Sequence, residues 1–208
     1  RPPARCPCCR APASGRSYQA CRSESVGQQL RQPDAAHAVR TYAQDLWIGA
    51  ALQLCGDDRV ISVLPLAHSY GLFGTFLAPL LVGATSILVP HFSPEDVLAA
   101  VDRHKATIFP GVATMFRRIL DSVDPTNAAW SSLRFCTSGA APCPWELAEE
   151  WRAATGIRIV RGYGMSELFR PIFFSPDDTL EIPESIGHAP KGVTLKLVDD
   201  QGAALGDD

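Results

Sequence analysis

The six-residue segment 162–167 combines side chains that together suit phosphate and nucleotide binding. Gly162 and Gly164 bracket Tyr163, and Ser166 and Glu167 follow directly. Glycines allow the backbone to approach a ligand closely, and a hydroxyl can bond a phosphate oxygen. A carboxylate can hold Mg²⁺ against that phosphate, and an aromatic ring can stack on a nucleobase. A glycine-rich turn beside an exposed acid is also common in proteins without such a ligand, so spacing alone makes this segment a candidate only.

Two further loops contain residues that suit a protein core poorly. Segment 64–71 contains His68 and Tyr70 in a turn bounded by proline and glycine, although a single such histidine is more often structural than functional. Segment 138–142 (Ser-Gly-Ala-Ala-Pro) lacks bulk, so a flat ring could lie against its backbone, and in isolation it would indicate a simple tight turn. Ligands of open α/β sheets bind at the carboxyl ends of the strands, which is where all three loops are expected.

The elements that must position these loops follow from alternating strand-like and helix-like patterns, which predict an α/β fold with a mostly parallel sheet and helical crossovers. Short β-branched apolar runs predict buried strands at 59–64, 85–89, 106–109, 133–137 and 157–160. Helices are expected at 35–54, 71–82, 93–104, 112–122 and 145–155. Ser93 can cap the third of these helices, and Gly156 can end the last.

The chain is expected to divide into three parts. Residues 1–25 are rich in Arg, Pro, Ser and Cys and predict an irregular or disordered segment. Residues 26–170 form the α/β unit, and 171–208 the start of a small antiparallel β subdomain that is truncated. Within that last part, 194–198 alternates as a strand would, and 199–202 is a turn.

Composition narrows the classes of function. The chain has 208 residues, 46% hydrophobic and 20% charged, as in soluble globular proteins, and its net charge of −3 gives no electrostatic case for nucleic acid or an anionic membrane surface. Its apolar runs are too short to span a bilayer, and no secretory signal is evident, so a cytoplasmic location is the default expectation.

Seven cysteines do not form a metal-binding pattern. Cys6, Cys8, Cys9 and Cys21 are crowded near the start without a second ligand pair, so reduced, incidental thiols are favoured over a zinc site.

In this order, the three loops resemble successive core motifs of the AMP-dependent synthetase and ligase superfamily, which contains acyl-CoA synthetases, aryl-CoA ligases and peptide-synthetase adenylation domains. Segments 65–71, 138–142 and 162–167 carry the resemblance, which extends from about Val26 to the last residue. Segment 109–115 also looks like the strip that lines the acyl pocket of that family.

The resemblance implies a role for each loop residue. Residues flanking adenine would be Ser138, Gly139, Ala140, Ala141 and Pro142, with the middle three nearest the ring. Tyr163 would stack on that ring, within a nucleotide-binding loop completed by Gly162, Gly164, Met165 and Ser166. The implied catalytic residues are His68, at the junction of the carboxylate and thiol paths, Ser166, on the α-phosphate, and Glu167, as the Mg²⁺ ligand.

The implied reaction is ATP-dependent adenylation of a carboxylic acid, followed by transfer to coenzyme A. A fatty or aromatic acid is favoured because no amine-binding aspartate is evident. No charged residue stands out among the acyl-pocket candidates either, which are Tyr70, Gly71, Gly111 and Met115. Two alternatives stay open: an adenylation domain that loads a carrier protein, and a non-catalytic nucleotide-binding remnant.

Two departures from the family pattern lead us to expect a truncated fragment that is inactive alone. The family's hydroxyl-rich phosphate loop with its lysine is replaced by segment 10–19, which lacks lysine. We hypothesise a frameshift within 1–25, which an intact loop in another reading frame of the gene would support and its absence from every frame would contradict. The ribose-binding aspartate, hinge and mobile domain that follow in the family are not found either.

Overall fold

The structure is a computed structural model that describes residues 52–166, 169–178, 182–190 and 193–205. The segment 1–25, most of the helix expected at 35–54, the first four cysteines and Glu167 lie outside the described residues. No helix in the described ranges is long and apolar enough to cross a membrane.

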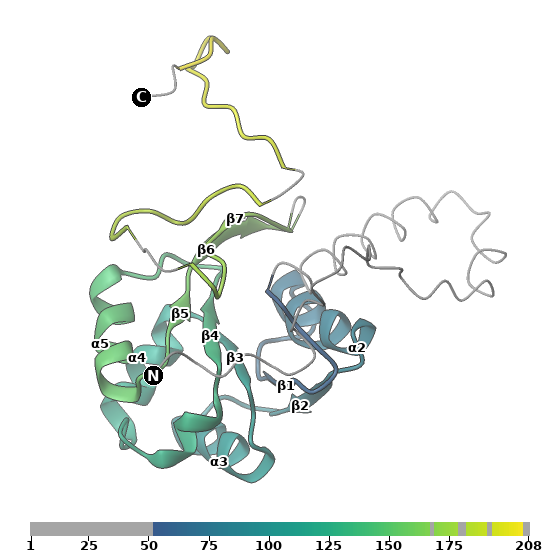
Figure 1. Cartoon of the computed structure of the whole chain (residues 1–208), viewed down its shortest axis with the longest axis vertical. Helices are drawn as coiled ribbons and strands as arrows, with labels where there is room; N and C mark the ends of the chain where they lie inside the picture. Colours follow the sequence, from purple (N-terminus) through teal and green to yellow (C-terminus); the bar gives the residue numbers. More distant parts are fainter. Residues whose placement is uncertain (1–51, 167–168, 179–181, 191–192, 206–208) are drawn as a thin grey trace, which may run out of the picture.

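Five parallel strands form the central sheet, which confirms the predicted fold class. They are β1 (Arg59–Ser62), β2 (Thr85–Leu88), β3 (Ile108–Gly111), β4 (Phe135–Ser138) and β5 (Ile159–Val160), in the spatial order β2-β1-β3-β4-β5 (Figure 1). The last three begin two residues later than expected. The register pairs Gly111 with Ser138, so the carboxyl ends of β3 and β4 lie side by side.

Helices cover one face of this sheet. They are α3 (Pro94–His104), α4 (Ala113–Ser122) and α5 (Trp145–Thr155), which bury an apolar face against Ile61, Phe109 and Cys136. As predicted, the Ser93 hydroxyl accepts a hydrogen bond from the Asp96 amide at 3.0 Å, and Gly156 ends α5 in the left-handed conformation. A 3₁₀ turn, η3 (Ala128–Ser132), precedes β4.

The helix expected at 71–82 is instead a π-helix, η2 (Tyr70–Leu77), followed by the short α2 (Ala78–Leu81). Thr75 explains the difference locally: its buried hydroxyl bonds the Gly71 carbonyl oxygen at 2.7 Å and the Ser62 hydroxyl at 2.7 Å. A side chain that occupies a helical carbonyl competes with the regular backbone bond and widens the turn.

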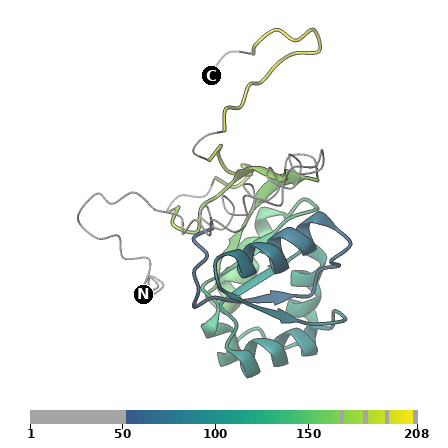
Figure 2. The same ribbon diagram turned by 90° about the vertical axis from the view of Figure 1, so that its right-hand side faces the viewer.

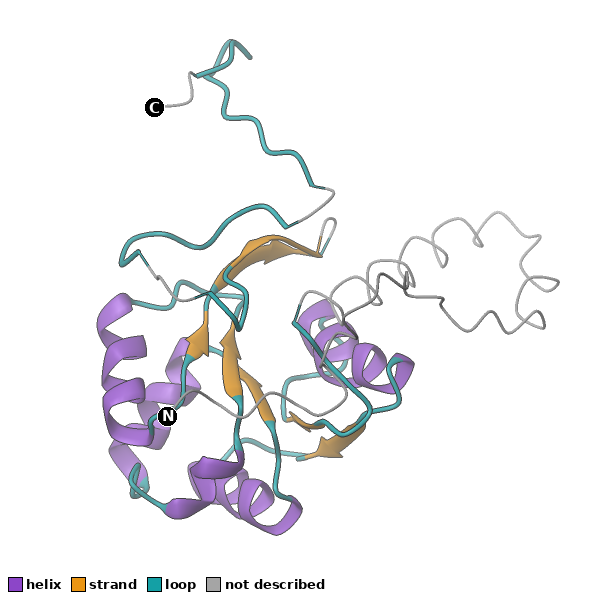
Figure 3. Cartoon of the chain, viewed as in Figure 1, coloured by secondary structure: helices purple, strands orange, loops and turns teal. Residues whose placement is uncertain are grey.

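The sequence analysis predicted a loop at 162–167, and this prediction is wrong for the first four residues, which form the strand β6 (Gly162–Met165). This strand pairs antiparallel with β7 (Phe169–Phe173), with Tyr163 opposite Ile172 (Figure 3). Glycine-rich sequence has weak strand propensity, but backbone hydrogen bonds to a paired strand override it. The hairpin is a small antiparallel element of the expected kind, but it begins at Gly162, within the segment 26–170 that the sequence analysis assigned to the α/β unit.

Segment 194–198 is not the strand that its alternation predicted. It makes a single bridge, between Val198 and Ala204, around a turn in which the Asp199 carboxylate accepts hydrogen bonds from the amides of Gln201 and Ala203. Residues 193–205 extend away from the sheet (Figure 2). Because no strand among the described residues pairs with this segment, its apolar side chains Leu195, Leu197 and Val198 stay exposed.

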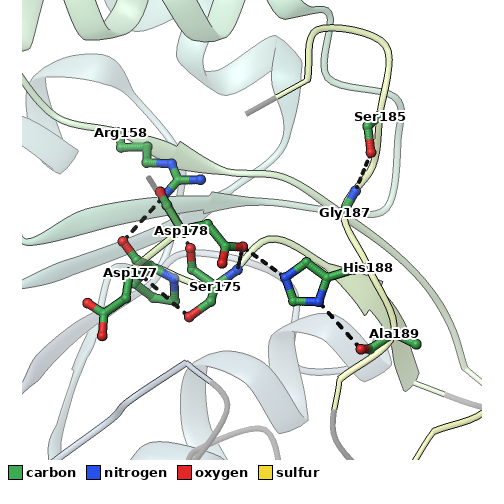
Figure 4. A network of polar contacts seen from close by, with 9 residues as sticks. Arg158, Ser175, Asp177, Asp178, Ser185, Gly187, His188 and Ala189 are labelled. Atoms are coloured by element: carbon green, nitrogen blue, oxygen red, sulfur yellow. Dashed lines mark hydrogen bonds and ion pairs between the residues drawn. The ribbon is translucent and has the colours of Figure 1, made fainter. Parts of the chain in front are cut away.

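A polar network fastens the segment after β7 to the sheet. The Arg158 guanidinium donates to the backbone oxygens of Ser175 and Asp178, at 3.1 and 2.7 Å (Figure 4). The Asp178 carboxylate in turn accepts from the Ser175 amide at 2.6 Å and lies 3.0 Å from His188 Nε2. Because Arg158 precedes β5 directly, these contacts hold the chain beside the amino-terminal end of β5 rather than at the carboxyl ends of the strands, where the three loops lie.

Candidate active site

All three loops line one cavity at the carboxyl ends of the strands. The cavity has a volume of about 230 Å³. Its lining includes His68, Ser69, Tyr70, Gly139, Ala140, Gly162, Gly164, Met165 and Ser166. A hydrogen bond between the Ser69 and Ser166 hydroxyls, 3.0 Å apart, joins the first loop to the third. The structure therefore brings together residues from loops that are almost 100 positions apart in the chain.

The first loop is held in place by a close backbone contact at Gly71. A Cβ atom on this residue would lie 2.2 Å from the Pro65 carbonyl oxygen, so no other residue type fits without moving the loop. The Pro65 oxygen also accepts a hydrogen bond from the His68 amide at 3.0 Å. The His68 ring is exposed, and its Nδ1 accepts a hydrogen bond from the Tyr70 backbone amide, with 3.1 Å between the two nitrogens. A neutral His68 with this contact therefore carries its proton on Nε2.

Tyr70 forms a fixed wall of the cavity. Its ring lies against Gly74 and Gly139, where added Cβ atoms would come within 3.2 and 3.1 Å of it. Its hydroxyl lies 2.8 Å from the Thr137 hydroxyl. Burial raises the pKa of this phenol, so it stays protonated at neutral pH. Tyr70 is the only one of the four acyl-pocket candidates that lines the described cavity; Gly71, Gly111 and Met115 do not.

The turn after β4 presents an exposed surface of small side chains, formed by Ala140, Ala141 and Pro142. Ala140 has a φ of +62°, which is the left-handed region that favours glycine. Ser138 is buried, and its hydroxyl has no hydrogen-bond partner among the described residues. The exposed part of the turn thus carries only small side chains, whereas Ser138 lies below its surface. The role of these residues beside an adenine stays a prediction.

The third loop divides between two sides of the hairpin. Gly162, Gly164, Met165 and Ser166 line the cavity, but Tyr163 does not, and its side chain is 45% exposed. The sequence analysis treated these residues as one loop, whereas β6 separates Tyr163 from the others, with an irregularity in the pairing to β7 between Tyr163 and Met165. A stacking role for Tyr163 would therefore place the nucleobase outside the cavity.

Arg170 is the residue in the cavity that the sequence analysis missed. It comes from β7 and is only 8% exposed, so the cavity contains a charged residue that was not among the acyl-pocket candidates. Burial lowers the pKa of its guanidinium. The signal in the sequence was a single charged residue within the otherwise apolar segment 169–173. The sequence alone does not tell that Arg170 lines the cavity, because this depends on the pairing of β7 with β6.

The metal assignment rests on Glu167, which lies outside the described residues. In the ranges that are described, no group of three or more His, Cys, Asp and Glu side chains is arranged to hold a metal ion. Mg²⁺ commonly binds through one or two carboxylates together with substrate phosphates, so a lone Glu167 beside the Ser166 hydroxyl is chemically suited to it.

Residues 29–208 match the family described as AMP-binding enzyme. The chain belongs to this family. Similar proteins include a long-chain-fatty-acid–CoA ligase of Bacillus subtilis (35% identity over 112 residues, 54% of this chain and 20% of the relative). A second is a mitochondrial malonate–CoA ligase of Mus musculus (30% identity over 158 residues, 69% of this chain and 27% of the relative). The crystal structure of an anthranilate CoA ligase in complex with anthranoyl-AMP is also similar, with a TM-score of 0.73 and 32% identity. That match covers 82% of this chain and 33% of the ligase.

The similar proteins share one kind of activity but differ in the acid that they use. The two relatives and the similar structure are CoA ligases, and the likeness of this chain to them holds at the level of the family. Their acids differ, so the substrate does not follow from the likeness. The chain spans about a fifth to a third of the length of these relatives.

Proposed function

We propose that this chain supplies the nucleotide- and acid-binding part of an AMP-forming ligase that joins a carboxylic acid to coenzyme A. The observation that carries the proposal is the meeting of the three loops at one cavity, joined by the Ser69–Ser166 hydrogen bond. Coenzyme A is favoured over a carrier protein because the relatives reported above are CoA ligases.

The chemistry consists of two displacements. In the first, a carboxylate oxygen of the acid attacks the α-phosphorus of ATP, the bond to the bridging oxygen breaks, and pyrophosphate leaves. In the second, the thiol sulfur attacks the acyl carbon, AMP leaves, and the thiol proton passes to solvent. Aligning the reactants and neutralising charge account for most of the catalysis in such reactions.

Each loop has a part in the first displacement. Ser166, oriented by Ser69, donates a hydrogen bond from its hydroxyl to an α-phosphate oxygen, and the exposed turn 139–142 together with Tyr163 holds the adenine. His68, whose neutral tautomer carries its proton on Nε2, donates to an oxygen of the reacting carboxylate. Glu167 would hold Mg²⁺, which offsets phosphate charge when bound.

The cavity favours a compact acid. An apolar cavity of about 150 Å³ can hold a benzene ring, so the volume of about 230 Å³ has room for one ring or a short chain. We therefore propose an aromatic or short-chain acid within the broader class of fatty and aromatic acids.

Calorimetric titration of the chain with AMP tests the nucleotide site. Replacing Tyr163 with Ala is expected to weaken AMP binding about 5- to 150-fold, because stacking of one base on an aromatic ring contributes roughly 1–3 kcal/mol. Tyr163→Phe keeps the ring and should bind like the wild type. Because Tyr163 is largely exposed, neither substitution should disturb folding. Absence of AMP binding to the folded wild-type chain, or equal binding by Tyr163→Ala, would contradict the proposal.

A further inference from the structure

Arg170 places a buried positive charge in the wall of an otherwise largely apolar cavity. Its neighbours there include Leu54, Val60, Ile108 and Met165. Its one described hydrogen bond runs from Nη2 to the Val160 carbonyl oxygen, at 3.2 Å. Among the described residues no carboxylate forms an ion pair with it. A guanidinium has five N–H donors, so most of its capacity is left for another acceptor.

The two neighbouring arginines show what a purely structural guanidinium looks like in this fold. Arg158 donates to three backbone carbonyl oxygens, those of Ser175, Pro176 and Asp178. Arg161 donates to Pro183 and Ile182 and lies over the Trp145 ring, 4.9 Å from its centroid. Both bind the segment after β7 to the sheet. Within the described ranges Arg170 has no comparable set of partners, and it alone of the three lines the cavity.

The chain also makes room for this side chain. A Cβ atom on Gly162 would lie 2.7 Å from Nε and 2.8 Å from Nη2 of Arg170. The guanidinium therefore occupies the space that a side chain at position 162 would need. Its flat face is supported by the Phe173 ring, whose centroid is 5.4 Å from the central carbon. The position of the charge is thus fixed by both strands of the hairpin.

A buried charge without a partner costs several kcal/mol in a typical protein, and an anionic partner offsets that cost. We propose that Arg170 binds a second anionic group, a carboxylate, at the far end of the acid substrate from the carboxylate that reacts. This inference rests on the proposed function. It changes the expected substrate from a simple fatty or aromatic acid to a dicarboxylic acid whose two ends are recognised separately, one at His68 and one at Arg170.

Two pairs of acids, each pair matched in shape, test the role of the second carboxylate. Glutarate and 5-methylhexanoate differ only in ending with a carboxylate or an isopropyl group, and terephthalate and 4-isopropylbenzoate form the corresponding aromatic pair. Binding is measured by calorimetry on the whole chain without nucleotide. In at least one pair the dicarboxylate should bind about 10- to 100-fold more tightly, as expected for charge-assisted hydrogen bonds in a partly desolvated site.

Substitution of Arg170 separates recognition from structure. Arg170→Met should reverse the preference within the pair, whereas a purely structural role would weaken both acids alike. Arg170→Lys keeps the charge without the forked geometry and should retain a reduced preference. Arg161→Met serves as the control, because it should lower thermal stability and leave the preference unchanged.

The outcomes separate this inference from the proposed function. Equal binding of the two acids in both pairs, no binding of any of them, or a preference that survives in Arg170→Met would overturn the role of Arg170. Equal binding would also result if Arg170 held the reacting carboxylate, which every acid has. AMP titration of the same samples reports on the proposed function independently.

Discussion

At the scale of single residues, Ala140 is the place where the turn after β4 departs from relaxed backbone geometry. Its φ of +62° costs an alanine about 1 kcal/mol or more, a cost that glycine avoids. Ala140→Gly should therefore raise the free energy of unfolding by about 0.5–1 kcal/mol, measured by urea denaturation. The neighbouring Ala141 is exposed and has no positive φ, so Ala141→Gly should lower stability slightly. The account of strain in this turn would be wrong if both substitutions destabilised the chain equally.

At the scale of elements, the first loop and η2 depend on the close approach at Gly71. The Cβ of Gly71→Ala would lie 2.2 Å from the Pro65 carbonyl oxygen and must push the loop away from the helix. We expect a loss of about 2–3 kcal/mol in the free energy of unfolding, as for other overpacked sites. Because Ser69 would move with the loop, its contact with Ser166 and the binding of AMP should weaken too. Gly56→Ala, where the nearest atom would be 3.6 Å away, is the matched control and should stay within about 0.5 kcal/mol of the wild type. An unchanged stability in Gly71→Ala would show that the loop is not held as described.

Much of the element plan could be predicted from the sequence, because strands buried on both faces of a parallel sheet give continuous apolar runs. The 59–64 run, the Ser93 cap and the Gly156 stop are local signals of this kind. The conformations of 162–165 and 194–198 could not be predicted in the same way. The first became a strand because β7 pairs with it, and the second did not because no described strand does. Pairing depends on residues elsewhere in the chain, which local propensity does not contain.

At the scale of the whole molecule, the meeting point of the three loops followed from the rule that strand ends in a parallel sheet converge on one edge. Two features of the site did not follow from it. Tyr163 does not line the cavity although its neighbours in β6 do, and Arg170 lines the cavity because β7 pairs with β6. Both depend on tertiary geometry, and under the proposed function they would divide the site into an exposed nucleotide side and an enclosed acid side.

The most direct test of the account is the affinity of the chain for a stable mimic of an acyl-adenylate, benzoyl-sulfamoyl-adenosine, compared with AMP. Because the mimic would occupy both sides of the site at once, calorimetry should show it binding about 10- to 100-fold more tightly than AMP, as expected when roughly one aromatic ring is buried. Equal affinity for the two ligands would mean that the cavity does not receive the acyl group, and would contradict the proposal that these loops form the site of an acid-activating ligase.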